Sequence, residues 1–428
     1  MRALPIVRQI RQPDGQRHII MEDASQDLRL PMYWPNLYAT LMLAGAHLAN
    51  NSIRIAMEHI AYAYRWAATR DLDLDALLCG GEFLTPGQLS DLVTTLRKST
   101  RGLGRVGDHA PNVTSLPKSG TRSKIGAFES ARRIANVGAY FAWHIERCKF
   151  RAKSEEARWQ VELAETALKA FLQSKPPRKD AEVDAPKAGL TPEQRVILWQ
   201  LIHPDNPDNP FRSWFDKRRN WLLIRTLSAT GVRRAENLLI KIEDVHYHVH
   251  RISIHRPGND KAETRTDPPQ AKTLARSVAI AKTLSADLHR YIVEVWGQFP
   301  RESRQHGFLW TSVKGEPLSL RRVNAMFRFL HLRCPALPPD FSPHSLRYDS
   351  NDRLSEAFDR EPLETRPSWE EQKRIRDQRY GWSPKGNTAA RYDHRRTSRL
   401  SDEFAEKASE LMDSPFEVIE KIKRAKKT

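Results

Sequence analysis

Apolar positions follow two different patterns along the first 173 residues. Short β-branched runs stand on both sides of Pro13-Asp14-Gly15, which is turn chemistry, so residues 1–30 are predicted to form a β-hairpin arm. From residue 31 to residue 173 apolar residues recur every three or four positions, as in "SIRIAMEHIAYAYRWAATR". This second pattern predicts an all-helical domain.

A polar stretch separates this region from a second domain. Residues 174–189, "SKPPRKDAEVDAPKAG", mix proline with charge and contain almost nothing to bury, which predicts a linker. The following Thr191-Pro192-Glu193-Gln194 has the pattern of a capping box with proline at the first helical position. A helix is therefore predicted to open a second domain, which we assign to residues 190–412.

The second domain is predicted to be helical around one small sheet. "HRISIHR" and "ARSVAIA" are β-rich and are joined by a polar loop, and further helices are predicted at 319–333, 368–380 and 401–412. After Ser414-Pro415 an amphipathic pattern with a basic end predicts a C-terminal tail over residues 413–428, able to leave its own domain. The expected fold class is mainly α with a small β-sheet.

Charge narrows the class of partner. The 428 residues contain 70 Lys and Arg against 52 Asp and Glu, a formal net charge of +18, which is typical of proteins that bind nucleic acid. Cys79, Cys148 and Cys334 are far apart, so neither a disulfide framework nor a zinc site is expected. We expect no signal peptide and no membrane span, and hence a soluble protein of the cytoplasm.

Two short motifs carry candidate chemistry. In "LSATGVRRAENLLI" a helix is predicted to end at Gly231, with Arg233 in the first turn of the next helix and Glu236 one turn further on. A guanidinium in this place can bind a phosphate with two donors while the carboxylate orients it, although such a junction is more often only a surface ion pair. In "DFSPHSLRYDS" His344 and Arg347 share one face of a predicted helix start, a position that suits an anion.

The order of these motifs resembles the tyrosine recombinase, or phage integrase, family. The resemblance covers residues 190–412 and rests on "ATGVRRAE", "PHSLRYD" and "GW" followed ten residues later by Tyr392. It implies a helical, SAM-like core-binding domain over residues 31–173 and a mixed α/β catalytic domain, which together close as a C-shaped clamp on double-stranded DNA.

The resemblance also implies roles for individual residues. Tyr392 would be the nucleophile that attacks a DNA phosphate, helped by its basic surroundings because a phenol normally titrates near pH 10. Arg233 and Arg347 would bind the non-bridging phosphate oxygens, and Glu236 would support Arg233. His344 would transfer a proton or donate a further hydrogen bond to the phosphate.

Two further positions match the family pattern less directly. Trp382 stands where most members have a second histidine, and its indole N–H can still donate a hydrogen bond but cannot transfer a proton. The family's general acid is a lysine of the β-hairpin. Lys272, in "AKTLARSVAI", matches this pattern better than Lys261, the alternative in "PGNDKAETR".

The interval before the nucleophile departs from the family pattern. Residues 348–391, 44 positions, separate Arg347 from Tyr392, and the surplus falls in "DREPLETRPSWEEQKRIRD", which could be a partner surface, a lid or a longer loop. Tyr380 and Tyr348 are the rival nucleophiles, but neither has the family's spacing.

The resulting expectation is a site-specific DNA recombinase of the integrase or transposase type, acting through a 3′-phosphotyrosyl intermediate without metal or nucleotide cofactor. It would act on DNA at the nucleoid as a homo-oligomer, a tetramer in synapsis, with possible accessory proteins. The alternatives are a type IB topoisomerase, which shares the chemistry, and a catalytically silent DNA-binding regulator on the same fold.

Overall fold

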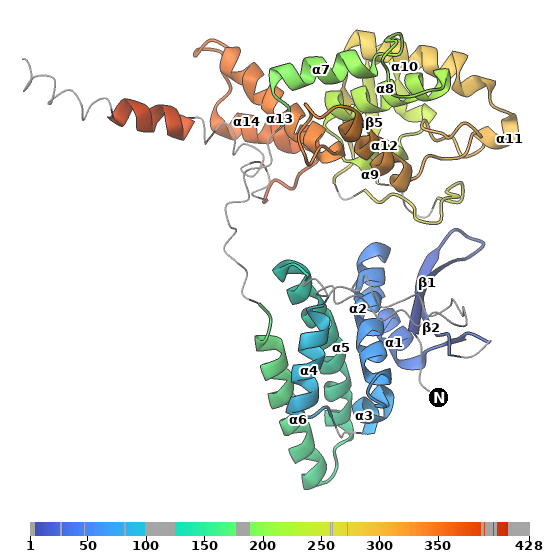
Figure 1. Cartoon of the computed structure of the whole chain (residues 1–428), viewed down its shortest axis with the longest axis vertical. Helices are drawn as coiled ribbons and strands as arrows, with labels where there is room; N and C mark the ends of the chain where they lie inside the picture. Colours follow the sequence, from blue (N-terminus) through green and yellow to red (C-terminus); the bar gives the residue numbers. More distant parts are fainter. Residues whose placement is uncertain are drawn as a thin grey trace, which may run out of the picture. The chain divides into compact units, whose positions relative to one another are not determined.

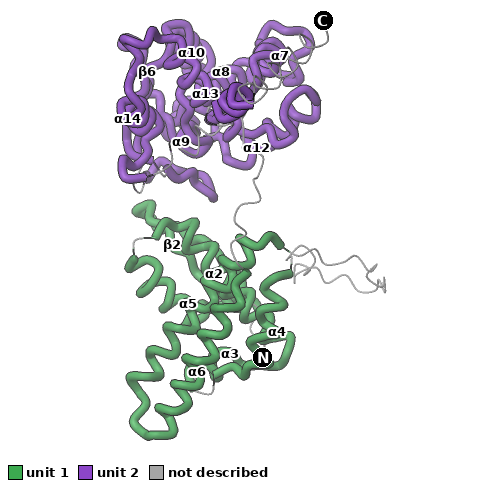
Figure 2. The backbone as a smooth tube through the Cα atoms, turned by 90° about the vertical axis from the view of Figure 1, so that its left-hand side faces the viewer, with its two compact units in different colours: residues 1–182 green, residues 183–428 purple. Residues whose placement is uncertain are grey.

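The computed structural model divides the chain into two compact units, Met1–Glu182 and Val183–Thr428, shown in Figure 2. The boundary lies within the predicted linker 174–189. The structure describes residues 5–25, 28–46, 48–80, 83–98, 125–176, 189–256, 258, 260–271, 273–386, 389, 397 and 400–409. Lys272, Tyr392 and the predicted tail 413–428 lie outside these residues.

Unit 1 is helical with a small antiparallel sheet in the order β1-β2-β3 (Figure 1). Its strands are β1 (Pro5–Arg11), β2 (Arg17–Asp23) and β3 (Leu30–Pro31). Its helices are α1 (Tyr33–Tyr38), the π-helix η1 (Ala39–Ala44), α2 (Asn50–Ala68), α3 (Leu74–Gly80), α4 (Pro86–Leu96), α5 (Ala127–Arg151) and α6 (Glu155–Gln173).

The β1–β2 hairpin packs against α2. Ile19 and Met21 of β2 are buried in the same hydrophobic core as the helices. Two side chains of α2 bond to the hairpin backbone: Arg65 Nη2 donates to Pro5 O at 3.0 Å, and Asn50 Nδ2 donates to Arg17 O at 3.2 Å. The hairpin therefore shares the core of unit 1.

In unit 2, helices surround a three-stranded antiparallel sheet in the order β4-β5-β6. Its strands are β4 (Val245–His246), β5 (Arg251–Ile254) and β6 (Arg276–Ala279). Its longer helices are α7 (Pro192–Ile202), α8 (Trp214–Thr230), α9 (Arg234–Leu239), α10 (Lys282–Glu294), α12 (Leu320–Arg333), α13 (Pro343–Arg360) and α14 (Trp369–Tyr380). Its short turns of helix are η2 (Ile242–Asp244), η3 (Tyr247–Val249), η4 (Trp296–Gln298) and α11 (Arg301–Arg304).

Two local predictions for unit 2 are confirmed. Thr191 caps α7 as its sequence indicates, because Thr191 Oγ1 accepts from Gln194 N at 3.2 Å and Gln194 Oε1 accepts from Thr191 N at 3.0 Å. The two β-rich segments pair as β5 and β6, with Ile252 opposite Val278. The fold class is mainly α with small β-sheets, as expected. Within the described part of the chain, no helix combines the length and apolar character needed to cross a membrane.

The surplus segment before Tyr392 contributes to a packed helix. It begins in the last turn of α13 and runs into α14, and the two helices lie side by side in Figure 1. Arg376 of α14 is 0% exposed and donates to Asn351 Oδ1 at 3.1 Å and to Ser355 Oγ at 2.8 Å, both on α13. The α14 part of the segment thus packs on α13 through a few buried side chains, whereas residues 361–365 are exposed and non-helical. The interpretation as a longer loop is wrong for the helical part alone.

Candidate active site

The site begins where α8 ends. Gly231 is the C-cap residue of α8 with φ +62°, in the left-handed region that favours glycine. A Cβ built on Gly231 would lie 2.4 Å from Cε1 of Tyr380, so a larger residue also has no room. This tight turn leads directly to Arg233, the N-cap residue of α9, whose side chain is 30% exposed.

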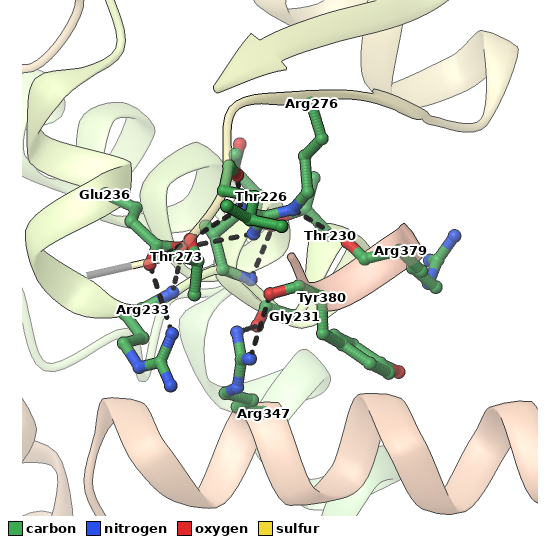
Figure 3. Close-up of polar contacts among 12 residues, drawn as sticks. Thr226, Thr230, Gly231, Arg233, Glu236, Thr273, Arg276, Arg347, Arg379 and Tyr380 are labelled. Atoms are coloured by element: carbon green, nitrogen blue, oxygen red, sulfur yellow. Dashed lines mark hydrogen bonds and ion pairs between the residues drawn. The ribbon is translucent and has the colours of Figure 1, made fainter. Parts of the chain in front are cut away.

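Glu236 holds Arg233 in place. Its carboxylate accepts from the Arg233 amide at 3.1 Å and lies 3.4 Å from Arg233 Nη1, so the supporting role expected from the sequence has the required geometry. Two further donors reach the same carboxylate, Thr273 Oγ1 at 2.7 Å and Arg276 Nη2 at 3.0 Å (Figure 3). Glu236 thus connects α9 to the start of β6.

The Glu236 carboxyl is ionised although its side chain is 0% exposed. Burial by itself raises its pKa, but the charge of Arg276 and the hydrogen bonds from Thr273 and the Arg233 amide lower the pKa below its ordinary value. A buried carboxylate of this kind is stable only while its donors remain, since an unpaired buried charge is costly.

Arg347 lies in the interior of the site. It is 1% exposed, and its terminal nitrogens donate to two backbone carbonyls, Nη1 to Gly231 O at 2.6 Å and Nη2 to Tyr380 O at 3.2 Å. Its Cζ is 5.1 Å from the ring centroid of Tyr380 and 5.4 Å from that of Trp382. The guanidinium therefore ties α13 to the ends of α8 and α14.

His344 stands one turn before Arg347, in the first turn of α13, and is exposed while its neighbours in that turn are buried. Its ring contacts Tyr348 edge to face, with centroids 4.9 Å apart and planes at 81°. The predicted helix start is confirmed, and it is capped by Ser342, whose amide N donates to Ser345 Oγ at 3.1 Å. His344 and Arg347 are on one helix, as predicted, but His344 faces solvent while Arg347 is buried.

The Gly381-Trp382 motif follows α14. Gly381 is the C-cap residue with φ +65°, and the next amide, Trp382 N, donates to Asp377 O at 2.9 Å. Trp382 is 4% exposed and its ring lies 4.9 Å from that of Tyr380. Tyr380 and Trp382 thereby form a small apolar cluster that also contains Ala389.

Three arginines bind the carbonyl groups at the end of α8. Arg353 Nη2 donates to Ser228 O at 2.6 Å, Arg379 Nη2 donates to Ala229 O at 2.6 Å, and Arg347 contacts Gly231 O. The last carbonyls of a helix have no partner within the helix and carry partial negative charge, so cations there stabilise the helix end. These contacts hold the end of α8, from which the chain turns into Arg233 and α9.

The structure brings together Arg233, Glu236, Arg347 and Trp382, which are predicted from three separate motifs. The rival nucleophile Tyr380 is 0% exposed, and its hydroxyl lies 3.3 Å from Ser350 Oγ. In Figure 3 its ring points away from Arg233. Tyr348, the other rival, is half-buried beside His344.

The residues beside the two candidate lysines have different surroundings. Thr273, next to Lys272, bonds to Glu236 within the site. Asp260, next to Lys261, pairs with Lys241 Nζ at 3.1 Å and lines a cavity of about 530 Å³ whose walls are residues between Leu239 and Asp260 together with Phe308. Of the described residues next to the two lysines, only Thr273, beside Lys272, contacts Glu236.

Arg276, Thr273 and Arg379 were not predicted as site residues. "KTLAR" indicated only a basic residue near the start of the strand, and no sequence signal distinguished Arg379 from the other cations of "QKRIRDQRY". Their contacts with Glu236, with Ala229 O and with Arg379 O span 37 to 150 positions of the chain. In the described part of the chain no three His, Cys, Asp or Glu side chains are grouped so as to hold a metal ion.

Comparison with known proteins defines the class of this domain. Residues 211–370 match the phage integrase family. Residues 211–370 thus form a phage integrase, or tyrosine recombinase, domain, which confirms the resemblance for the part of the chain that contains "ATGVRRAE" and "PHSLRYD".

Individual relatives are distant. The tyrosine recombinase XerC of Staphylococcus epidermidis strain RP62A is 23% identical over 156 residues, 36% of this chain and 44% of XerC, so the match spans less than half of that relative. The integrase of transposon Tn1549, solved with transposon right end DNA, is 15% identical with a TM-score of 0.48 over 86% of this chain and 100% of that one. The recombinase XerH, solved with a palindromic difH substrate, is 13% identical with a TM-score of 0.41 over 82% of this chain and 95% of that one.

Proposed function

We propose that the protein is a site-specific DNA recombinase of the integrase or transposase type, which cuts and rejoins strands through a 3′-phosphotyrosyl intermediate. The observation that carries the proposal is that Arg233, Glu236 and Arg347, inside the segment 211–370 that matches the phage integrase family, meet Trp382, which follows that segment. Arg233 and Arg347 belong to motifs more than a hundred residues apart in the chain, and both lie at the Gly231 turn.

The two arginines would stabilise the phosphate as its negative charge rises in the transition state. Arg233 is partly exposed and oriented by Glu236, so it can meet a phosphate from solvent. Arg347 is fixed by two carbonyls, and a guanidinium has five N–H donors, so one side chain can bond to both backbone and phosphate. Trp382 would donate its indole N–H, and His344 would transfer a proton or add a hydrogen bond.

Tyr392 would be the nucleophile. Its phenol oxygen would form a bond to phosphorus while the bond from phosphorus to the 5′-oxygen breaks, which leaves the 3′-phosphate on the protein and a free 5′-hydroxyl. Two observations support this choice. Ala389, three residues before Tyr392, is buried with Tyr380 and Trp382, and the rival Tyr380 is itself enclosed in that cluster.

Lys272 would protonate the leaving 5′-oxygen. The contact of its neighbour Thr273 with Glu236 supports Lys272 over Lys261. Because the phosphotyrosyl bond retains the energy of the phosphodiester, rejoining needs no nucleotide, and with arginines on the phosphate oxygens the proposed mechanism uses no metal. The helical domain 31–173 and the catalytic domain 190–412 would form a C-shaped clamp on DNA.

Trapping on DNA tests the proposal. The protein first selects binding sites from a random-sequence pool, and a nicked duplex carrying the selected site is then incubated with it in excess EDTA. We expect a covalent adduct on the selected site and strand exchange between two such sites. Relaxation of any plasmid without site preference would indicate the topoisomerase alternative, and binding without an adduct would indicate the silent regulator.

The tail 413–428 is proposed to dock on a neighbouring protomer in a tetramer. Deleting it should leave half-site binding intact and preserve some adduct formation, while recombination falls about tenfold or more because the linkage between protomers is lost. Gel-shift and recombination assays on the same site measure the two effects. Full recombination by the truncated protein would contradict the exchange of the tail.

A further inference from the structure

Arg276, the first residue of β6, bonds to three separate parts of the domain. Its Nε donates to Arg379 O at 2.8 Å, its Nη1 to Thr273 Oγ1 at 2.7 Å, and its Nη2 to Glu236 Oε2 at 3.0 Å (Figure 3). Its side chain is 5% exposed. All three guanidinium nitrogens therefore have protein acceptors, which fixes both the position and the plane of the group.

The strand start is also attached to the end of α14 through its backbone. Leu274 N donates to Gly381 O at 3.1 Å, and Leu274 O accepts from Arg276 Nη1 at 3.2 Å. A Cβ on Gly381 would lie 2.7 Å from that same Nη1, so the glycine allows the close approach. Residues 273–276 are thus held between Glu236 on one side and residues 379–381 on the other.

The arrangement distinguishes Arg276 from the arginines that would contact the phosphate. The Arg233 side chain is 30% exposed, whereas that of Arg276 is 5% exposed, and two acceptors of Arg276, Thr273 Oγ1 and Leu274 O, belong to its own strand start. Its contacts hold the segment that enters β6 rather than a substrate atom. The part of the reaction that depends on this segment is the protonation of the leaving group.

We propose that Arg276 is a positioning residue for leaving-group protonation: it holds residues 273–276, the segment that directly follows the proposed acid Lys272 in the chain, against Glu236 and α14. This inference rests on the proposed function. In the step concerned, the bond from phosphorus to the 5′-oxygen breaks, the electron pair stays on that oxygen, and a proton moves to it from the Lys272 ammonium group. A sulfur in place of this oxygen leaves as a thiolate and needs no proton.

The test compares single-turnover cleavage of two suicide substrates, one with the 5′-bridging oxygen and one with sulfur. Arg276→Met is expected to slow cleavage of the oxygen substrate about 100-fold, the lower range for loss of general-acid catalysis, and to cleave the sulfur substrate within about threefold of the wild-type protein. Arg276→Lys keeps the charge but not the fork of donors, so its cleavage rate on the oxygen substrate should lie between those of the wild-type protein and Arg276→Met. DNA affinity should remain unchanged in both variants.

Four further variants complete the comparison. Lys272→Ala should show the same rescue by sulfur, and Arg233→Ala should not, since charge on the non-bridging oxygens still needs a guanidinium. Arg251→Met is the matched control: this arginine is in β5 of the same sheet, its side chain donates to Oγ and O of Ser277, and its loss should leave both rates unchanged. Thr273→Val removes one acceptor of Arg276 and should reproduce part of the defect if Arg276→Met does not fold.

Equal slowing of Arg276→Met on both substrates would overturn the proposal, because Arg276 would then act through Arg233 on the phosphate. Failure of the proposed function looks different: no adduct would form even with the wild-type protein. If the wild-type protein forms the adduct but sulfur rescues only Arg276→Met, Lys272 is not the acid, and the proposal that Arg276 acts by positioning Lys272 is overturned. Loss of rescue in every variant would remove both roles.

Discussion

Replacing Tyr392 by phenylalanine is expected to eliminate the covalent protein–DNA adduct while DNA affinity stays nearly unchanged. The substitution removes one hydroxyl from a large interface whose affinity comes mainly from phosphate contacts of a chain with net charge +18. Without the phenol oxygen no phosphotyrosyl bond can form, so cleavage should fall to background. Denaturing gels of the trapped nicked substrate and gel shifts on the intact site measure the two quantities.

Tyr380→Phe is the matched control, because it also removes one phenol oxygen close to the Gly381-Trp382 motif. The Tyr380 hydroxyl is enclosed 3.3 Å from Ser350 Oγ, so its loss should leave the adduct in place and cost at most about 1 kcal/mol of stability. An adduct formed by Tyr392→Phe but not by Tyr380→Phe would show that the register of the final motif is wrong and that Tyr380 is the nucleophile.

Gly231→Ala is expected to lower the free energy of unfolding of unit 2 by about 3 kcal/mol. A non-glycine residue at φ +62° costs about 1–2 kcal/mol, and overpacking a core costs about 1–3 kcal/mol more. The added Cβ would meet Cε1 of Tyr380 at 2.4 Å and Ser350 Oγ at 2.9 Å, so the end of α14 has to move. Urea unfolding followed by tryptophan fluorescence measures the change.

The same substitution should impair cleavage more than DNA binding. Gly231 O accepts from Arg347 Nη1, and Arg233 follows two residues later. If the turn is displaced, the distance between the two guanidinium groups changes. Gly258→Ala is the control, since a Cβ there meets nothing within 4 Å, and it should change neither stability nor cleavage. If Gly231→Ala were as stable and active as Gly258→Ala, the close packing of Tyr380 on this turn would not exist.

Local chemistry explains which features could be predicted from the sequence. The capping box at Thr191, the pairing of β5 with β6 and the contact of Glu236 with Arg233 each involve residues close together in the chain or a repeating pattern. The order of the motifs then identified a recombinase domain, and the match of residues 211–370 confirms it. The roles of Lys272 and Tyr392, which lie outside the described residues, stay predictions.

Other features depend on contacts that no local pattern encodes. The β1–β2 hairpin was predicted as an arm, but its packing on α2 depends on Arg65 and Asn50, whose polar side chains reach carbonyls of the hairpin. Likewise, the surplus segment gave no signal that Arg376 would be completely buried against α13. A charged helix pattern normally indicates a solvated face, and only the tertiary partners reverse that interpretation.

The sequence by itself determined the class of the domain and the residue types of the site, because helix ends, strand pairing and motif spacing depend on residues within short stretches of the chain. The tertiary structure alone decided that Arg347 is buried on the carbonyls of Gly231 and Tyr380, and that Arg276 connects Glu236 with the end of α14. The physical reason is that a long, charged side chain can be buried only where distant segments supply all its acceptors, and the positions of those acceptors follow from the folded backbone.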